Sequence, residues 1–168
     1  MFTSEEQELP KTLVLGIGNT LLSDEGIGVH VLEQLKTSSS AKLRNAEIMD
    51  GGTLSFTLAE PIENCNQFIV IDAAELKSAP GTVQVFENQA MDDYITSGNK
   101  RSVHEVSLAD VMSITLLSGH LPQKRALVGI QPLDIDWGEN PTDAVAAAIP
   151  QAITEIESLL QRWSHESE

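Results

Sequence analysis

The stretch "LVLGIGNTLLSDEGIGVHVLEQL", residues 13–35, decides the fold. It opens with an apolar run that ends at Gly16 and Gly18, as a strand buried on both faces ends in a glycine turn. Apolar residues then recur every three or four positions, which is the spacing of an amphipathic helix. The stretch therefore predicts a strand over 12–18 and a helix over 24–36.

The two glycines also begin a dinucleotide-binding fingerprint, but the chain departs from it. The third glycine would fall at position 21, which is Leu21. Asp24 and Glu25 follow, where a bound phosphate would be repelled. A nucleotide-binding α/β domain stays an alternative, with these three residues against it.

The rest of the chain continues the alternation of strand and helix. Strands are expected at 46–50, 67–73, 82–87 and 125–132, and helices at 53–60 (ending before Pro61), 107–119 and 143–163 (with a kink near Pro150). The polar stretch 88–100 lacks periodicity and is predicted to be a long loop. The pattern predicts one α/β domain over 1–168, with a mostly parallel sheet covered by helices on both faces and a loose segment at 1–10.

Composition narrows the possible partners. The formal net charge of −15 argues against nucleic acid binding, because phosphates would be repelled. The first residues do not resemble a signal peptide, and no apolar run is long enough for a membrane span. The single cysteine, Cys65, is interpreted as structural and fits a reducing compartment, so we expect a cytoplasmic protein.

Acidic residues follow three of the expected strands. Glu25 comes after the first, Asp50 ends the second, and Asp72 ends the third. Ligands of such sheets bind beyond the carboxyl ends of the strands. With His104, in a loop just before a helix, these residues make a plausible set for a borderline divalent metal such as nickel or zinc.

Structural roles are open for each of these residues. Glu25 could be an acid stabilised by a helix dipole and Asp24 an N-cap, while Asp50 precedes two glycines and could form a turn. Asp72 could cap a neighbouring helix, and His104 could be an exposed loop residue.

Five segments together resemble the nickel–iron hydrogenase maturation endopeptidases. They are "LGIGNTLLSDEGIG" (15–28), "DGGT" (50–53), "IDAAELKSAPG" (71–81), "VHEVSLADV" (103–111) and "GHLPQKRALVGIQP" (119–132). The first block, in which D-E-x-x-G follows G-x-G-N, is the most specific.

The resemblance implies a twisted sheet of about five strands sandwiched by helices, and a metal-contacting site of Glu25, Asp72 and His104. It implies no cofactor of the protein's own, because the nickel is presented by the substrate, although the site could also take zinc or cadmium. The implied partner is the precursor of the [NiFe] hydrogenase large subunit, whose C-terminal extension is removed. We expect a monomer.

The resemblance leaves the hydrolytic group open. Either the metal polarises the scissile carbonyl while Glu25 or Asp72 directs a water, or the metal only docks the substrate and Asp50 assists. A non-catalytic nickel-binding chaperone that uses the same three ligands is the remaining alternative.

Overall fold

The computed structural model describes residues 11–38, 43, 45–97 and 106–166. Its centre is a five-stranded sheet in the order β2-β1-β3-β5-β4. The strands are β1 (Thr12–Ile17), β2 (Ala46–Gly52), β3 (Gln67–Ala73), β4 (Val83–Glu87) and β5 (Lys124–Ile130). All neighbours pair in parallel except β4, which runs antiparallel to β5 at the edge of the sheet. The predicted mostly parallel sheet is confirmed.

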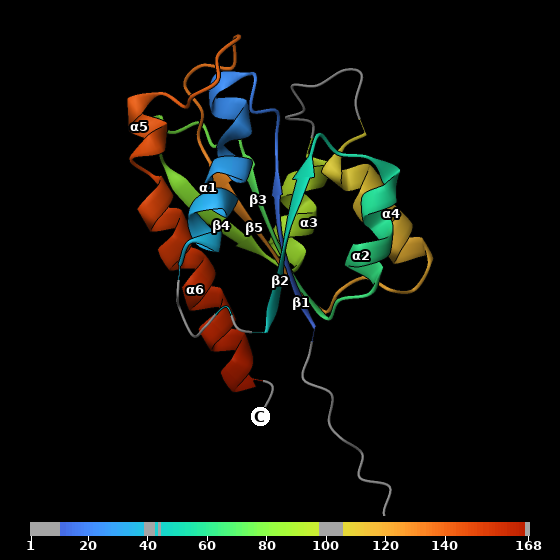
Figure 1. Ribbon diagram of the computed structural model, residues 1–168. Helices are drawn as coiled ribbons and strands as arrows, with labels where there is room; N and C mark the ends of the chain where they lie inside the picture. The colour runs from blue at the N-terminus through green and yellow to red at the C-terminus, as the bar shows by residue number, and fades with distance from the viewer. Residues whose placement is uncertain (1–10, 39–42, 44, 98–105, 167–168) are drawn as a thin grey trace, which may run out of the picture.

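Helices cover both faces of this sheet (Figure 1). They are α1 (Ile27–Lys36), α2 (Ala59–Glu63), α3 (Gln89–Thr96), α4 (Leu108–Leu117), α5 (Asp143–Ala146) and α6 (Ile149–Glu166), with short 3-10 turns η1 (Ser23–Gly26) and η3 (Phe56–Leu58). Alternate residues of the central strands face opposite helical layers, as strand geometry requires. Val14 and Ile69 join the core under α1 and α6, while Leu15 and Val70 join the core under α2 and α4.

The prediction of a loop over 88–100 is wrong for its central part. Residues Gln89–Thr96 form α3, which begins after Asn88 in a left-handed conformation (φ 52°). Met91 is fully buried, and Tyr94 and Ile95 pack against the same core cluster. This spacing of three and four residues is helical, but the polar residues between them hid it.

Three other predicted boundaries also differ. The helix expected at 53–60 is η3 followed by α2, and Pro61 lies inside the first turn of α2, where its missing N–H would have had no partner. The closing helix is divided into α5 and α6, and Pro150 is the second residue of α6. The helix expected from residue 24 begins at Ile27, after η1.

Two glycines bring the start of α1 against the sheet. A Cβ at Gly28 would collide with the carbonyl oxygens of Ile71 and Ile17, so only glycine allows α1 to lie so close to β3 and β1. Gly18 adopts φ +136°, and a Cβ there would collide with the carbonyl oxygen of Glu25. The glycines of the first sequence block therefore place Glu25 beside the carboxyl end of β3, where Asp72 lies.

No helix in the described part of the chain is long and apolar enough to cross a bilayer.

Candidate active site

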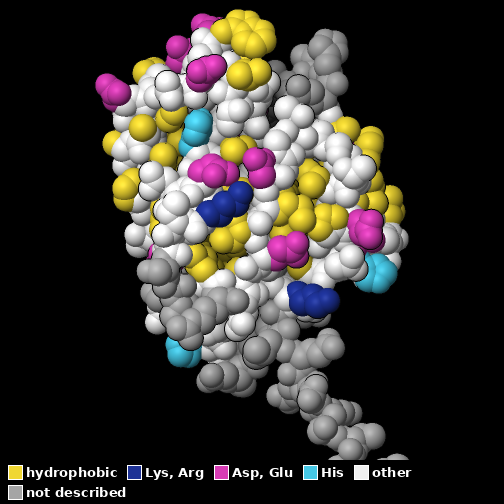
Figure 2. Space-filling view, in the orientation of Figure 1, with side chains coloured by type: hydrophobic (Ala, Val, Ile, Leu, Met, Phe, Trp, Pro, Cys, Tyr) yellow, Lys and Arg dark blue, Asp and Glu magenta, His cyan; other side chains and the backbone are white. Residues whose placement is uncertain are grey.

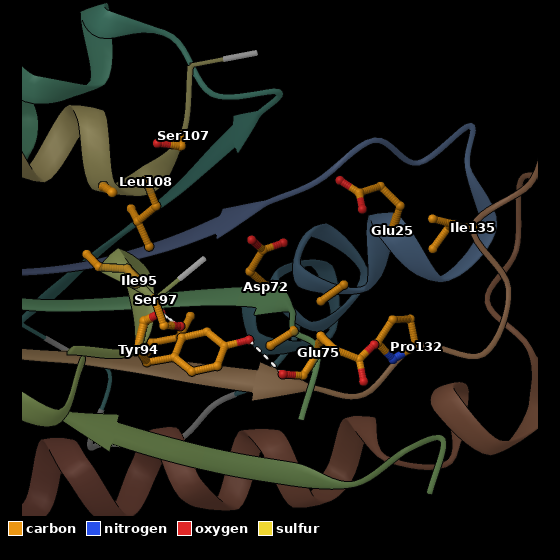
Figure 3. A pocket seen from close by; sticks show the side chains of 14 residues that line it. Glu25, Asp72, Glu75, Tyr94, Ile95, Ser97, Ser107, Leu108, Pro132 and Ile135 are labelled. Atoms are coloured by element: carbon orange, nitrogen blue, oxygen red, sulfur yellow. Dashed lines mark hydrogen bonds between the residues drawn. The ribbon is translucent and has the colours of Figure 1, made fainter. Parts of the chain in front are cut away.

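A cleft of about 200 Å³ opens at the carboxyl edge of the sheet (Figure 3). Its lining comes from the turn η1, the end of β3 and the residues after it, α3, the start of α4, β5 and the segment after β5. The lining residues that carry the account below are Glu25, Asp72, Glu75, Tyr94, Ser97, Ser107, Pro132 and Ile135. The cleft lies where ligands of open α/β sheets bind.

Glu25 and Asp72 both line this cleft, and Figure 3 shows their carboxylates facing the same space. Burial raises the pKa of Asp72 well above its ordinary value, and the negative charge of Glu25 raises it further. A hydrogen bond from the backbone N–H of Ala73 lowers this pKa, but its effect is smaller. Two carboxylates that share a cleft in this way can hold a cation between them or direct a water molecule. The structure thus brings together two of the predicted site residues.

Asp50, the third acid predicted for the site, is not brought to this pair. Asp50 lies in the edge strand β2, two residues before its end at Gly52. Its side chain is exposed, does not line the cleft, and accepts a hydrogen bond from the backbone N–H of Gly52 at 2.8 Å. This is the turn geometry that the two following glycines indicated. His104 lies outside the described residues. Ser97 and Ser107, which precede and follow it in the sequence, both line the cleft.

Asp24 does not have the expected role of an N-cap. Its carboxylate is fully buried and accepts hydrogen bonds from the backbone N–H groups of Leu133 (2.9 Å), Asp134 (3.0 Å) and Thr142 (2.7 Å), and from the Thr142 hydroxyl. Burial alone would raise the pKa of Asp24, but these hydrogen bonds together lower it below its ordinary value. Asp24 is therefore an ionised anchor. It binds the segment after β5, and it directly precedes Glu25 in the sequence.

Sequence reasoning missed a set of contacts at the opposite side of the cleft. Tyr94 donates a hydrogen bond to the carbonyl of Glu75 at 3.0 Å and stacks on Phe86, with ring centroids 4.4 Å apart. Gln131 accepts a hydrogen bond from the backbone N–H of Leu76 at 2.6 Å and donates one to the Glu75 carboxylate at 3.3 Å. These contacts fix the backbone that follows Asp72. The helical spacing in α3 was the signal that would have found Tyr94.

Among the described residues, no three histidine, cysteine, aspartate or glutamate side chains form a group that could hold a metal ion. Glu25 and Asp72 supply two oxygen ligands, and the third predicted ligand lies in the segment that is not described.

Cys65 has no part in this cleft. It is buried under the sheet, and its thiol donates to the carbonyl of Ile62 at 3.1 Å. Burial raises its pKa to about 12, so the reactive thiolate is scarce at neutral pH. The interpretation of Cys65 as structural agrees with this position.

The sequence and the fold match those of a known class of peptidase. A sequence profile described as "Hydrogenase maturation protease" matches residues 29–159. HupD of Rhizobium leguminosarum bv. viciae, a hydrogenase expression/formation protein, is 37% identical over 155 residues, which cover 92% of this chain and 76% of that protein. The hydrogenase 2 maturation protease of Escherichia coli is 36% identical over 152 residues, which cover 90% and 91%.

Solved structures agree. The hydrogenase maturating endopeptidase HybD from Escherichia coli superposes with a TM-score of 0.80 at 34% identity, covering 90% of this chain and 93% of that one. The chain belongs to the hydrogenase maturation protease family, and it is an endopeptidase of hydrogenase maturation. The alternatives of a nucleotide-binding domain and of a non-catalytic chaperone are thereby set aside.

Proposed function

We propose that this protease removes the C-terminal extension from the precursor of a [NiFe] hydrogenase large subunit, and that it recognises the nickel which the precursor already carries. The observation that carries the proposal is the pairing of Glu25 and Asp72 in one cleft of a hydrogenase maturation protease. In this scheme nickel is part of the substrate, and the protease has no metal of its own.

The charge of the cleft supports a cationic substrate centre. Glu25 and Asp72 repel each other, and a divalent ion between them would remove that repulsion. His104 is proposed as the nitrogen ligand, and the proposal is supported by Ser97 and Ser107, which precede and follow it in the sequence and both line the cleft. Carboxylate and imidazole ligands suit nickel, and they would also accept zinc or cadmium.

The hydrolytic step requires a positioned water and a polarised carbonyl. We assign the first task to Glu25 or Asp72, because both are acidic side chains on the cleft surface. Nickel bound to the precursor would fix the scissile bond beside them, which makes metal loading a condition for cleavage. Asp50 stays a weaker prediction for this step, because its side chain is engaged in the turn at Gly52.

The proposal predicts a defined product. Incubating the purified protease with the nickel-loaded precursor should shorten the large subunit by a single cut just after the histidine or arginine of its C-terminal cysteine motif, the position that the family resemblance implies. Intact-mass measurement of both fragments identifies the cut. An unchanged precursor mass, or a cut elsewhere in the subunit, would contradict the proposal.

A further inference from the structure

The segment between β5 and α5 exposes large apolar side chains. Within residues 133–139, here called the apolar loop, Leu133 is 64% exposed, Ile135 37% and Trp137 81%. Figure 1 places this connection at the top of the molecule, and Figure 2 shows apolar and acidic side chains gathered there. A concentration of exposed apolar side chains on one loop marks an interaction surface.

This exposure is fixed by the backbone of the loop. The N–H groups of Ser23 and Asp24 donate to the carbonyls of Gly138 (2.8 Å) and Asp134 (2.9 Å), and the Ser23 hydroxyl donates to the carbonyl of Asp136 (2.8 Å). Together with the hydrogen bonds to the Asp24 carboxylate described above, these contacts hold the inner side of the loop. The apolar side chains are therefore presented outward by a preorganised backbone, which lowers the entropic cost of binding.

The apolar loop is continuous with the cleft. Ile135 and the preceding Pro132 line the cleft together with Glu25, as Figure 3 shows. Leu133 and Trp137 lie on either side of Ile135 in the same loop. A polypeptide that enters the cleft between Glu25 and Ile135 therefore meets these side chains at its rim.

The apolar loop is also acidic. Asp134, Asp136 and Glu139 alternate with the apolar residues, and no lysine or arginine occurs between residues 126 and 161. All three acids are exposed, and none of the ion pairs found among the described residues involves this loop. Apolar side chains that alternate with carboxylates outside these ion pairs are complementary to a segment that combines apolar and basic side chains.

We propose that the apolar loop docks the part of the precursor polypeptide next to the scissile bond, and that this part carries large apolar side chains together with lysine or arginine. This inference rests on the proposed function, since it takes the hydrogenase precursor as the polypeptide that enters the cleft. Trp137 supplies the main apolar contact, because tryptophan is the side chain most enriched at energetic centres of interfaces.

The double substitution Leu133→Ser/Trp137→Ser tests the docking. It should raise KM for the nickel-loaded precursor about tenfold or more and leave kcat within about twofold, because it removes binding contacts away from the reacting groups. The matched control is Leu117→Ser, which removes an 87% exposed leucine at the last residue of α4, far along that helix from the Leu108 end that lines the cleft. The control should leave both constants unchanged. An unchanged KM in the double variant would overturn the proposal.

The charge component has its own test. Asp136→Asn/Glu139→Gln should weaken the dependence of KM on salt concentration, because fewer charges remain to be screened. An unaltered salt dependence would overturn the assignment of a basic segment.

A binding titration separates this inference from the proposed function. Precursor affinity is measured for the protease with Glu25→Gln, with and without Leu133→Ser/Trp137→Ser, so that no cleavage occurs. Weaker binding in the combined variant supports docking even if wild-type protein cleaves no precursor, an outcome that would reject only the proposed function. Equal affinity, or no binding by either protein, would overturn the docking inference.

Discussion

Glu25→Gln is expected to abolish cleavage of the nickel-loaded precursor, with a rate lower by more than about a hundredfold. The substitution keeps the size of the side chain in the turn η1 and removes its negative charge from the cleft. Without that charge the cleft loses the carboxylate that we propose to bind the substrate's nickel, which is also a candidate for directing water. Single-turnover cleavage followed by gel mobility gives the rate. A variant that retained more than about a tenth of wild-type activity would contradict the role of Glu25.

Asp72→Asn serves as the companion variant, because it separates function from stability. A raised carboxyl pKa means that the folded protein binds more protons than the unfolded chain, so stability falls as pH rises from the ordinary aspartate value toward the folded one. Asparagine carries no charge, so the folded protein no longer has to bury an ionised carboxylate beside Glu25 at neutral pH. We therefore expect loss of cleavage together with a melting temperature at neutral pH equal to or above that of the wild type. A loss of cleavage that came with unfolding would instead indicate a structural role.

Asp24→Ala is expected to give the largest loss of stability, about 3 kcal/mol, because it removes a buried carboxylate and leaves three part-buried backbone N–H donors without their acceptor. For a chain of this length that loss lowers the melting temperature by about 6–12 °C. Cleavage should fall as well, since Asp24 directly precedes Glu25 and its hydrogen bonds hold the apolar loop. Thermal unfolding followed by circular dichroism measures the effect.

Asp136→Ala is the matched control for Asp24→Ala. Asp136 lies in the loop that Asp24 anchors, but its side chain is exposed and its contacts to Ser23 and Asp134 are made by its backbone. Its removal should change stability by less than about 0.5 kcal/mol. Equal melting temperatures for the two variants would show that the Asp24 hydrogen bonds do not stabilise the fold.

Much of the fold could be predicted because its signals are local. The continuous apolar runs of β1 and β3 mark buried parallel strands, and a common sheet edge brings Glu25 and Asp72 together. Gly28 explains why the last position of D-E-x-x-G is a glycine, since any side chain there would push α1 away from β3.

The parts that could not be predicted depend on contacts between distant residues. The partners of Asp24 lie 109 to 118 positions further along the chain, and nothing in the local sequence distinguishes this anchor from an N-cap. The contacts of Gln131 with Leu76 and Glu75 are of the same kind, at separations of 55 and 56 residues. For α3, the local signal was present but weak, because Met91, Tyr94 and Ile95 are embedded among polar residues.

The nickel dependence of cleavage tests the central claim most directly. Two preparations of the same large-subunit precursor, one loaded with nickel and one free of it, are incubated with equal amounts of the wild-type protease, and the fraction shortened is followed by intact mass. Recognition of the substrate's nickel through Glu25 and Asp72 predicts complete shortening of the loaded precursor and none of the nickel-free one over the same period. Cleavage of both preparations at the same rate would show that nickel is not what the cleft recognises.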